Sequence, residues 1–326
     1  MNPRPVVTVL CEPADDHPAH LEELAGRLEF RFVDRAGLGD ALPGADALFL
    51  WDFFSDALAD HWDRCDRLRW IHVAAAGVDK LYFDELRASD ITVTNAHGIF
   101  DRPIAEFVLA SVFAHGKRLH ETWDLQTRRE WVHRETGTLT GRTALVVGTG
   151  GIGREIARLL RAAGLRVRGA GRTARTGDPD FGDVVPSAEL AAHVGDVDYL
   201  VNAAPLTPAT TGLVDDAVLR ALPARAHLVN IGRGPTVVEA DLLAALDRGG
   251  LDGASLDVVQ TEPLPADSPL WSAPGVVISP HMSGDVVGWK DALARQFVAN
   301  ARAWLAGEPL ANVVDNARGY VPSRVG

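Results

Sequence analysis

The feature that most constrains this sequence is a glycine-rich turn after a short apolar run. Residues Gly148-Thr149-Gly150-Gly151-Ile152-Gly153 separate the predicted strand Ala144–Val147 from a helical pattern that begins near Ile152. In such a unit the first glycine allows a tight turn, the second admits a pyrophosphate, and the third lets helix and strand pack closely. The helix N-terminus adds N–H groups and a partial positive charge. We predict a dinucleotide site here rather than a structural turn that binds nothing. The predicted contacts are Gly148, Gly150, Gly151, Ile152 and Gly153.

The rest of the chain alternates apolar runs with amphipathic stretches, which is typical of parallel sheets covered by helices. With 326 residues, the chain is longer than one hydrophobic core usually supports. Because the alternation restarts at Thr143, we predict two α/β domains, Rossmann-like or flavodoxin-like, with one inserted into the other. The outer domain is predicted at 1–101 and 286–326, and the inserted domain at 102–285. The apolar runs predicted as strands are Val6–Leu10, Ala47–Trp51, Trp70–Ala75, Ile91–Thr94, Ala144–Val147, Leu165–Ala170, Asp198–Ala203, His227–Ile231, Ala254–Val258 and Val276–Ser279.

Helical patterns fill the intervals between these runs. A long pattern starts after Pro103 and continues to about Arg128, and another long one comes near the end of the chain. We expect the tail after that last helix to return to the outer domain. The predicted helices are Ala19–Leu28, Asp56–Leu68, Ile104–Arg128, Ile152–Ala163 and Val287–Leu305.

Charge and composition exclude several classes of protein. The formal net charge of −12 opposes a general affinity for nucleic acid, because binding to that polyanion depends on clustered lysine and arginine. No apolar run reaches roughly eighteen residues and no basic segment precedes a long apolar core, so we expect a cytoplasmic protein without membrane partners. Cys11 and Cys65, the two cysteines, form neither a disulfide framework nor a metal-ligand spacing. No metal site is therefore expected.

The residues after the predicted strand Leu165–Ala170 bear on which dinucleotide binds. About 20 residues beyond the glycines, an NAD-binding protein usually offers a carboxylate to the adenosine ribose. Here the chain reads Gly171-Arg172-Thr173-Ala174-Arg175. Arg172, with Thr173 and Arg175, would hold a ribose 2'-phosphate through charge-assisted hydrogen bonds worth about 1.5–3 kcal/mol each. We therefore predict that NADP(H) is preferred and NAD(H) is possible. The alternative is a basic surface loop without preference.

Three later segments place a polar residue just past the end of a predicted strand, where open α/β sheets bind ligands. They read Ile231-Gly232-Arg233-Gly234, Asp257 followed by Glu262-Pro263, and Pro280-His281. With the glycine turn, these motifs resemble the D-isomer specific 2-hydroxyacid dehydrogenase family, and its glyoxylate/hydroxypyruvate reductase branch, over nearly the whole chain. The resemblance implies that Arg233, Glu262 and His281 are catalytic. It also implies that the inserted domain binds NAD(P) and the outer domain binds substrate.

These residue types suit the reaction of such an enzyme. Reduction of a 2-oxoacid adds hydride to the carbonyl carbon and a proton to its oxygen, which requires a proton donor within hydrogen-bond reach. His281 can donate the proton, and Glu262 can orient the ring and stabilise its charged form. Arg233 can bind the substrate carboxylate and polarise the carbonyl. Taken singly, a Pro-His or a Glu-Pro also has a structural explanation.

The resemblance assigns supporting residues as well. Asn202–Thr207 resembles the loop beside the nicotinamide ribose, Asp257 the acid near the nicotinamide carboxamide, and Ala74–Asp79 the loop whose N–H groups face the substrate carboxylate. The aromatic Trp51 either shapes the substrate pocket or belongs to the core. The further cofactor contacts predicted are Ala204, Pro205, Thr210, Ile231, Gly232, Arg233, Asp257, His281, Ser283 and Gly284. The substrate contacts predicted are Trp51, Ala76, Gly77, Arg233 and His281.

We therefore expect a homodimeric enzyme that reduces glyoxylate, hydroxypyruvate or a similar 2-ketoacid to the D-2-hydroxyacid with NADPH. In relatives an arm corresponding to 121–138 helps to form the dimer. The run Met282–Trp289 departs from the small, Thr- or Ser-rich run of many relatives, which leaves the substrate open. Two alternatives remain: a nucleotide-sensing interaction protein of the co-repressor kind, and a dehydrogenase of this fold with another substrate, such as phosphite or a bulky branched ketoacid.

Overall fold

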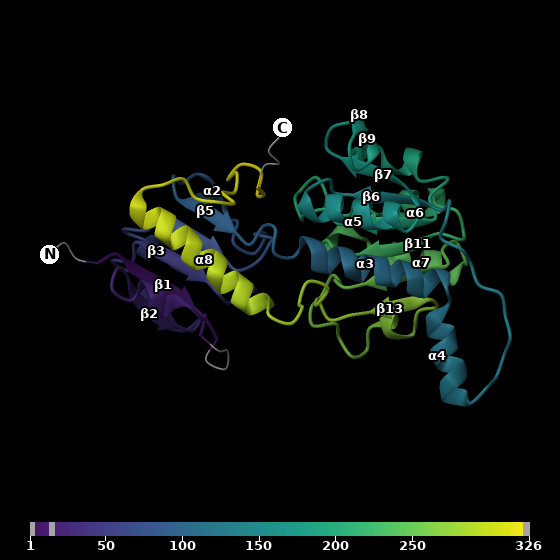
Figure 1. Ribbon diagram of the computed structural model, residues 1–326, viewed down its shortest axis with the longest axis horizontal. Coiled ribbons are helices and arrows are strands. Elements are labelled where there is room, and N and C mark those ends of the chain that lie inside the picture. The colour runs from purple at the N-terminus through teal and green to yellow at the C-terminus, as the bar shows by residue number, and fades with distance from the viewer. Residues whose placement is uncertain (1–3, 13–16, 322–326) are drawn as a thin grey trace. The chain divides into compact units, whose positions relative to one another are not determined.

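Two separate β-sheets organise the protein, each within its own unit of the chain (Figure 1). The computed structural model describes residues 4–12 and 17–321. One unit consists of Met1–Phe100 with Val286–Gly326, and the other of Asp101–Asp285. The second unit is therefore an insertion into the first. The predicted fold class, two α/β units built on parallel sheets, is confirmed.

Five parallel strands form the sheet of the first unit, in the order β2-β1-β3-β4-β5. Strands β3 and β4 are buried throughout, as near-continuous apolar runs in a covered parallel sheet should be. The edge strand β2 was not predicted, because Glu29 and Arg31 interrupt its apolar residues. The strands are β1 Val6–Leu10, β2 Glu29–Val33, β3 Ala47–Leu50, β4 Trp70–Val73 and β5 Thr92–Asn95.

Most helices of the first unit are shorter than the sequence indicated. The predicted helices Ala19–Leu28 and Asp56–Leu68 are wrong, because only 3-10 segments form there. The backbone leaves the helical region at His20, where φ is 66°, and at His61, where φ is −127°. The helical elements are η1 Leu21–Leu24, α1 Leu38–Ala41, η2 Ala59–Arg64, α2 Asp84–Arg87 and α8 Trp289–Ala306.

The long helix α8 covers the sheet of the first unit (Figure 1). It begins after Gly288, whose φ of 87° lies in the left-handed region and excludes the predicted start at Val287. The buried ring of Phe297 on α8 stacks on Phe49 of β3 at a centroid distance of 4.0 Å and on Trp70 of β4 at 5.4 Å. These stacked aromatic rings form the centre of the contact between helix and sheet.

Eight strands form the sheet of the second unit, in the order β13-β12-β11-β10-β6-β7-β9-β8. All neighbouring pairs are parallel except the hairpin of β8 and β9 at one edge. The loops after the parallel strands therefore emerge along a common edge of the sheet. The strands are β6 Thr143–Val147, β7 Arg166–Gly171, β8 Arg175–Asp178, β9 Gly182–Pro186, β10 Tyr199–Asn202, β11 His227–Asn230, β12 Gly253–Leu256 and β13 Val276–Ile278.

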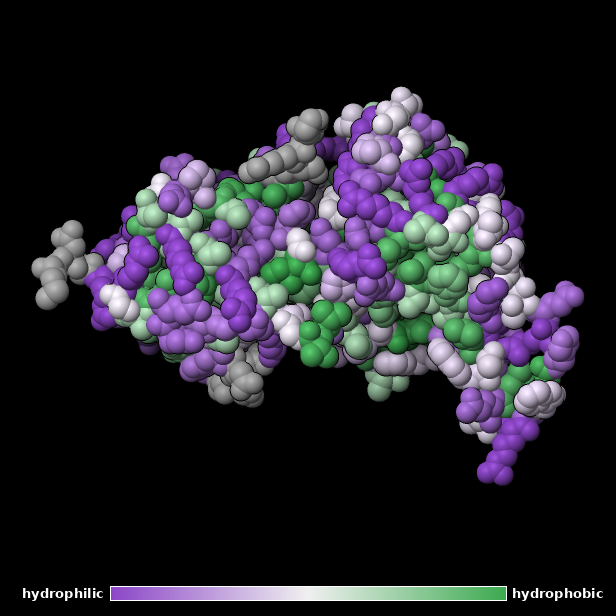
Figure 2. All heavy atoms as spheres, viewed as in Figure 1, coloured by the Kyte–Doolittle hydropathy of each residue, from purple (hydrophilic) through white to green (hydrophobic). Residues whose placement is uncertain are grey.

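The predicted helix Ile104–Arg128 is two helices, α3 Asp101–Gly116 and α4 Leu119–Arg128. Arg118 has a left-handed φ of 48°, which ends the helical path between them. Helix α4 and the segment after it stand away from the rest of their unit, and hydrophilic residues cover much of that arm (Figures 1 and 2). The remaining helical elements are α5 Gly151–Ala162, η3 Ser187–His193, α6 Asp216–Ala221, η4 Gly234–Thr236, α7 Glu239–Asp247 and η5 Pro269–Ser272. Within the described residues, none of the helices is long and apolar enough to cross a membrane.

Candidate active site

The glycine turn between β6 and α5 has the shape that a dinucleotide requires. Gly148 has a φ of +100°, and a Cβ there would lie 2.6 Å from the carbonyl oxygen of Ala203. At Gly153 a Cβ would lie 1.9 Å from the oxygen of Gly148, so this position also excludes a side chain. Around Gly150 nothing lies within 4 Å of a Cβ, and no side chain caps the N-terminus of α5. The predicted contacts at Gly151 and Ile152 occupy the first helical positions, where a pyrophosphate fits the helix end.

The loops after β10 and β11 are held together by a buried amide network. The side-chain Nδ2 of Asn202 donates to Asn230 Oδ1 at 2.9 Å and to Thr236 Oγ1 at 2.6 Å. The hydroxyl of Thr236 in turn donates to the carbonyl oxygen of Arg233 at 2.5 Å. Because all four groups are satisfied, the network holds the backbone of Arg233 in place. Sequence reasoning missed Asn230 and Thr236, although both lie beside a predicted site residue.

The predicted cofactor contacts in these loops occupy the same edge of the sheet. Ala204 is buried and Pro205 exposed, and Thr210 donates its hydroxyl hydrogen to the Pro205 carbonyl at 2.6 Å, which closes the turn after β10. Ile231 is buried, and a Cβ at Gly232 would lie 2.6 Å from the oxygen of Ala204. The two loops are therefore in close contact beside the glycine turn.

A histidine and a glutamate form the polar centre of the site. The Nδ1 atom of His281 lies 2.8 Å from Oε2 of Glu262, and the side chains are 30% and 34% exposed. The other carboxylate oxygen, Oε1, accepts the backbone N–H of Val259 at 3.0 Å. Burial alone would raise the pKa of Glu262, but the His281 and Val259 hydrogen bonds and the charges of His281 and Arg233 lower it. The carboxylate therefore keeps its charge at neutral pH and holds the imidazole by Nδ1.

Arg233 reaches this pair from the loop after β11. Its neighbour Gly234 lies so close to the loop after β12 that a Cβ would meet the oxygen of Val259 at 1.9 Å. The guanidinium Nη1 donates to the carbonyl oxygen of Gly232 at 2.8 Å, and its charge contributes to the lowered pKa of Glu262. All three predicted catalytic residues thus belong to one unit and lie along one edge of its sheet.

Asp257 anchors the loop that carries the histidine. Its side chain is buried, Oδ1 accepts the Ser279 hydroxyl at 2.5 Å and the Met282 N–H at 3.0 Å, and Oδ2 accepts the Ser283 N–H at 3.0 Å. His281 between them has a φ of 53°, a left-handed conformation that a non-glycine residue keeps only when its surroundings enforce it. Ser283 and its neighbour Gly284 are buried at the end of this loop. Asp257, predicted as a cofactor contact, is therefore also a support of the histidine.

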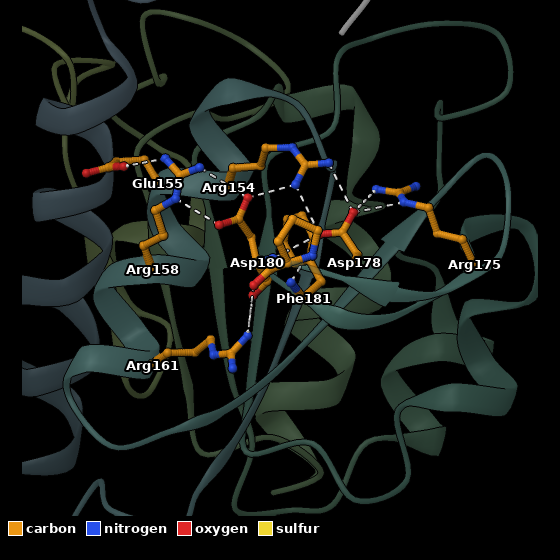
Figure 3. Close-up of polar contacts among 9 residues, drawn as sticks. Arg154, Glu155, Arg158, Arg161, Arg175, Asp178, Asp180 and Phe181 are labelled. Carbon is orange, nitrogen blue, oxygen red and sulfur yellow. Dashed lines mark hydrogen bonds and ion pairs between the residues drawn. The ribbon is translucent and has the colours of Figure 1, made fainter. Parts of the chain in front are cut away.

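At the other end of the edge, the predicted 2'-phosphate residues follow β7. Arg172 and Thr173 are exposed. Arg175 begins β8, and its Nη2 lies 2.8 Å from Oδ2 of Asp178, within a cluster of arginines and aspartates (Figure 3). Sequence reasoning named these basic residues but missed Asp178, which no motif singles out.

The predicted substrate residues Trp51, Ala76 and Gly77 belong to the first unit. Trp51 follows β3 and is only 5% exposed, its ring lying 5.6 Å from that of Phe49. The loop after β4 carries Ala76 and Gly77, and the Ala76 carbonyl accepts the Nδ2 of Asn95 at 2.6 Å. Both loops leave the carboxyl ends of adjacent parallel strands. In the part of the chain that the structure describes, no group of histidine, cysteine, aspartate and glutamate residues could hold a metal ion.

A glycine turn of the dinucleotide type, on the same sheet edge as a paired histidine and glutamate, is the arrangement expected of a nucleotide-dependent oxidoreductase. Residues 109–283 match the family described as D-isomer specific 2-hydroxyacid dehydrogenase, NAD binding domain. A glyoxylate/hydroxypyruvate reductase A of Yersinia enterocolitica is 30% identical over 306 residues, which span 92% of this chain and 95% of the relative. The chain belongs to the D-isomer specific 2-hydroxyacid dehydrogenase family, as its motifs predicted, and is an NAD(P)-dependent oxidoreductase acting on CH–OH groups.

Solved structures agree over nearly the whole chain. An NADPH-dependent glyoxylate/hydroxypyruvate reductase of Sinorhizobium meliloti, in complex with NADP and sulfate, superposes with a TM-score of 0.81 at 29% identity, covering 98% of this chain and 100% of that one. A probable 2-hydroxyacid dehydrogenase of Rhizobium etli, in complex with NADP, HEPES and L(+)-tartaric acid, gives a TM-score of 0.80 at 28% identity, with coverages of 97% and 100%.

Proposed function

We propose that the protein reduces a small 2-oxoacid, such as glyoxylate, hydroxypyruvate or a similar 2-ketoacid, to the D-2-hydroxyacid with NADPH. The observation that carries this proposal is the His281–Glu262 pair, 2.8 Å apart, on the same sheet edge as Arg233 and the glycine turn. The relatives from Yersinia enterocolitica and Sinorhizobium meliloti are glyoxylate/hydroxypyruvate reductases, which supports the substrate class.

The proposed chemistry assigns one task to each residue of the trio. NADPH, when bound, supplies the hydride. Arg233 binds the substrate carboxylate and polarises the carbonyl. His281 donates a proton from Nε2 to the carbonyl oxygen, since Nδ1 is the atom held by Glu262. In the reverse direction the same Nε2 accepts the hydroxyl proton. Glu262 stabilises the charged imidazole and keeps its tautomer, because its own lowered pKa maintains the negative charge.

The cofactor preference is proposed from the loop after β7. Arg172 and Thr173 are exposed where a 2'-phosphate would lie, and no carboxylate occupies the position after Gly171. The structural relatives from Sinorhizobium meliloti and Rhizobium etli are complexes with NADP, which supports NADP(H) over NAD(H). In this proposal the inserted unit binds the cofactor through the predicted residues. The first unit supplies substrate contacts from Trp51, Ala76 and Gly77.

We also propose that the protein is a homodimer formed through the arm 121–138. Along that arm the side chain of Trp131 is fully exposed and that of Trp123 is 52% exposed. Exposed large apolar side chains on a projecting element are typical of an interface.

The test of the function is initial-rate oxidation of NADPH and of NADH against a panel of 2-oxoacids. The parent protein should reduce at least one of them with NADPH preferred. His281→Gln should lower kcat by about 10²–10⁴-fold, the usual contribution of a positioned proton donor. Arg172→Ala should lose most of the NADPH preference. His193→Gln, a matched change in η3 away from the site, should retain the parental kcat.

Two results would contradict the proposal. Absence of turnover with every 2-oxoacid, although both cofactors bind, would remove the substrate assignment. A parental kcat in His281→Gln would remove the proton-transfer role.

A further inference from the structure

A buried carboxylate lies at the adenosine end of the proposed cofactor edge. The side chain of Asp178, the last residue of β8 before the turn to β9, is 3% exposed. Its Oδ1 accepts Arg154 Nη1 at 3.0 Å and the backbone N–H groups of Asp180 and Phe181 at 3.0 and 3.3 Å. Its Oδ2 accepts Arg154 Nη2 at 3.0 Å and Arg175 Nε at 2.9 Å. One carboxylate therefore joins the two arginines and the turn (Figure 3).

This carboxylate is charged at neutral pH. Burial alone would raise the pKa of Asp178, but the hydrogen bonds from Arg154, Arg175 and the backbone outweigh it and place the pKa well below its ordinary range. Hydrogen bonds between ionised groups are about twice as strong as neutral ones. The charged carboxylate therefore forms ion pairs with both arginines.

The turn between β8 and β9 packs against the glycine turn and the helix that follows it. Arg154 lies on α5 directly after Gly153, and its guanidinium lies 5.6 Å from the ring centroid of Phe181. On the other side, the Phe181 ring is so close to β7 that a Cβ at Gly169 would meet its Cγ at 2.9 Å, with Thr149 Cγ2 at 3.1 Å. The position of Asp178 is therefore set by the helix and the loop that would receive the pyrophosphate.

The contact leaves a defined part of Arg175 for a ligand. Asp178 engages the edge of the guanidinium formed by Nε and Nη2, at 2.9 and 2.8 Å. A guanidinium carries five N–H donors in a fixed plane, so the edge that contains Nη1 points away from the carboxylate. The Arg175 side chain is 37% exposed, which leaves that edge accessible.

We propose that Asp178 is a positioning residue for the 2'-phosphate of NADP(H): it pins Arg175 to the phosphate-binding helix so that the Nη1 edge meets the phosphate. The proposal rests on the proposed NADP(H) preference. An arginine held in place by a carboxylate loses less rotamer freedom on binding than a mobile one, so the phosphate binds more tightly.

If Asp178 acted only through its charge, its removal would change the affinity for the phosphate in the opposite direction. If Asp178 only neutralised Arg175, removal of its negative charge would strengthen binding of a phosphate dianion nearby. Positioning requires that the same removal weakens binding. The direction of the change therefore separates the two explanations.

The experiment is calorimetric titration of the full-length protein with adenosine 2',5'-bisphosphate and, separately, with adenosine 5'-monophosphate. The dissociation constant for adenosine 5'-monophosphate, divided by that for adenosine 2',5'-bisphosphate, measures the preference for the 2'-phosphate without catalysis. Asp178→Asn should reduce this ratio by about tenfold, the equivalent of one well-made contact. Asp180→Asn is the matched control. Asp180 lies in the turn after β8 and accepts hydrogen bonds from Arg154 and Arg158 of α5, but none from Arg175. The ratio for Asp180→Asn should stay close to the parental one.

A change at Arg175 keeps the test decisive if Asp178→Asn fails to fold, and a double variant tests the dependence on Arg175 if it folds. Arg175→Lys keeps the charge but lacks the two-point contact with Asp178, so it should lose the preference to a similar extent. In an Arg175→Gln background, Asp178→Asn should cause no additional loss, since it acts through that arginine. An unchanged or increased ratio in Asp178→Asn, or full preference in Arg175→Lys, overturns the positioning role. A parent without any 2'-phosphate preference instead overturns the cofactor assignment on which the role depends.

Discussion

At the scale of single residues, the site depends on carboxylates that position other groups. Glu262 holds the Nδ1 atom of His281, while the Asp257 side chain accepts the backbone N–H groups of the two residues that follow the histidine and the Ser279 hydroxyl that precedes it. The two contacts act on different parts of His281, its ring and its main chain. Orientation of the Nε2 atom therefore requires both acids.

Asp257→Asn should disturb the histidine without removing it. An asparagine amide replaces one of the two oxygens that accept the Ser279, Met282 and Ser283 donors, so His281 is no longer held in its left-handed conformation. A displacement of about 1 Å at a reacting group can lower turnover about 100-fold. We expect kcat for 2-oxoacid reduction to fall by about 10- to 100-fold, measured under saturating NADPH.

The matched control for this change is Asp215→Asn. Asp215 also accepts a backbone N–H, that of Val218 at 3.0 Å, but it caps helix α6. Its kcat should equal that of the parent. Equal turnover of Asp257→Asn and the parent would show that Asp257 does not support the histidine.

At the scale of elements, two glycines of the turn between β6 and α5 have different roles: Gly153 is required for folding, and Gly150 for binding of the dinucleotide. Gly153→Ala should destabilise the protein, because its Cβ would lie 1.9 Å from the Gly148 oxygen, a backbone atom that cannot move independently. Gly150→Ala should fold normally, since its φ of −79° suits alanine and nothing lies within 4 Å of a Cβ. The added methyl group would nevertheless occupy the approach to the pyrophosphate.

Thermal unfolding and fluorescence titration with NADPH distinguish these effects. Gly153→Ala should lower Tm by several degrees, whereas Gly150→Ala should keep the parental Tm and weaken NADPH binding about tenfold or more. Parental affinity in Gly150→Ala would argue that the dinucleotide does not bind at this turn.

The sheet of the first unit contains a titratable group that makes its stability depend on pH. His72 on β4 is fully buried among aromatic rings, with Nδ1 2.8 Å from Thr94 Oγ1, and burial lowers its pKa to about 3. Between pH 6.5 and 3 the unfolded chain binds the proton and the folded chain does not, so the free energy of unfolding falls as the pH falls. The slope from this group is at most about 1.4 kcal/mol per pH unit.

His72→Phe removes this titration and keeps an aromatic ring in the core. Between pH 7 and 5, the Tm of the first unit should therefore fall less in His72→Phe than in the parent, as measured by calorimetry. His17→Phe, a change at an exposed ring, should keep the parental pH dependence. Identical pH dependence in His72→Phe and the parent would contradict the assignment.

At the scale of the whole molecule, the arm 121–138 predicts assembly of two chains. Trp131→Ser and Trp123→Ser together remove its two exposed indole rings. We expect light scattering after size-exclusion chromatography to give a dimeric mass for the parent and a monomeric mass for the double variant. Trp271→Ser, which alters a tryptophan 57% exposed at η5, is the control and should remain dimeric. A monomeric parent would rule out the proposed homodimer.

The sequence predicted the local parts of the protein well where a strong pattern carries the signal. Apolar runs predicted most of the parallel strands, and the glycine turn predicted its own conformation, because only glycine fits at Gly148 and Gly153. The family could also be read from the sequence, since Arg233, Glu262 and His281 occur in order with their flanking motifs. The apolar runs, the glycine turn and each flanking motif depend on neighbours along the chain, and such neighbours can be read directly.

Only the tertiary structure decided which distant groups meet. Asp178 pairs with Arg154, 24 positions earlier in the chain, and Asp257 holds a loop about as far away, and no local pattern encodes either contact. Tertiary structure also decided two differences from the predicted helices. The predicted helix Ile104–Arg128 is split in two, and 3-10 segments form in place of two other helices. Apolar periodicity measures only the preference for a buried face, whereas the path of the backbone depends on what it packs against.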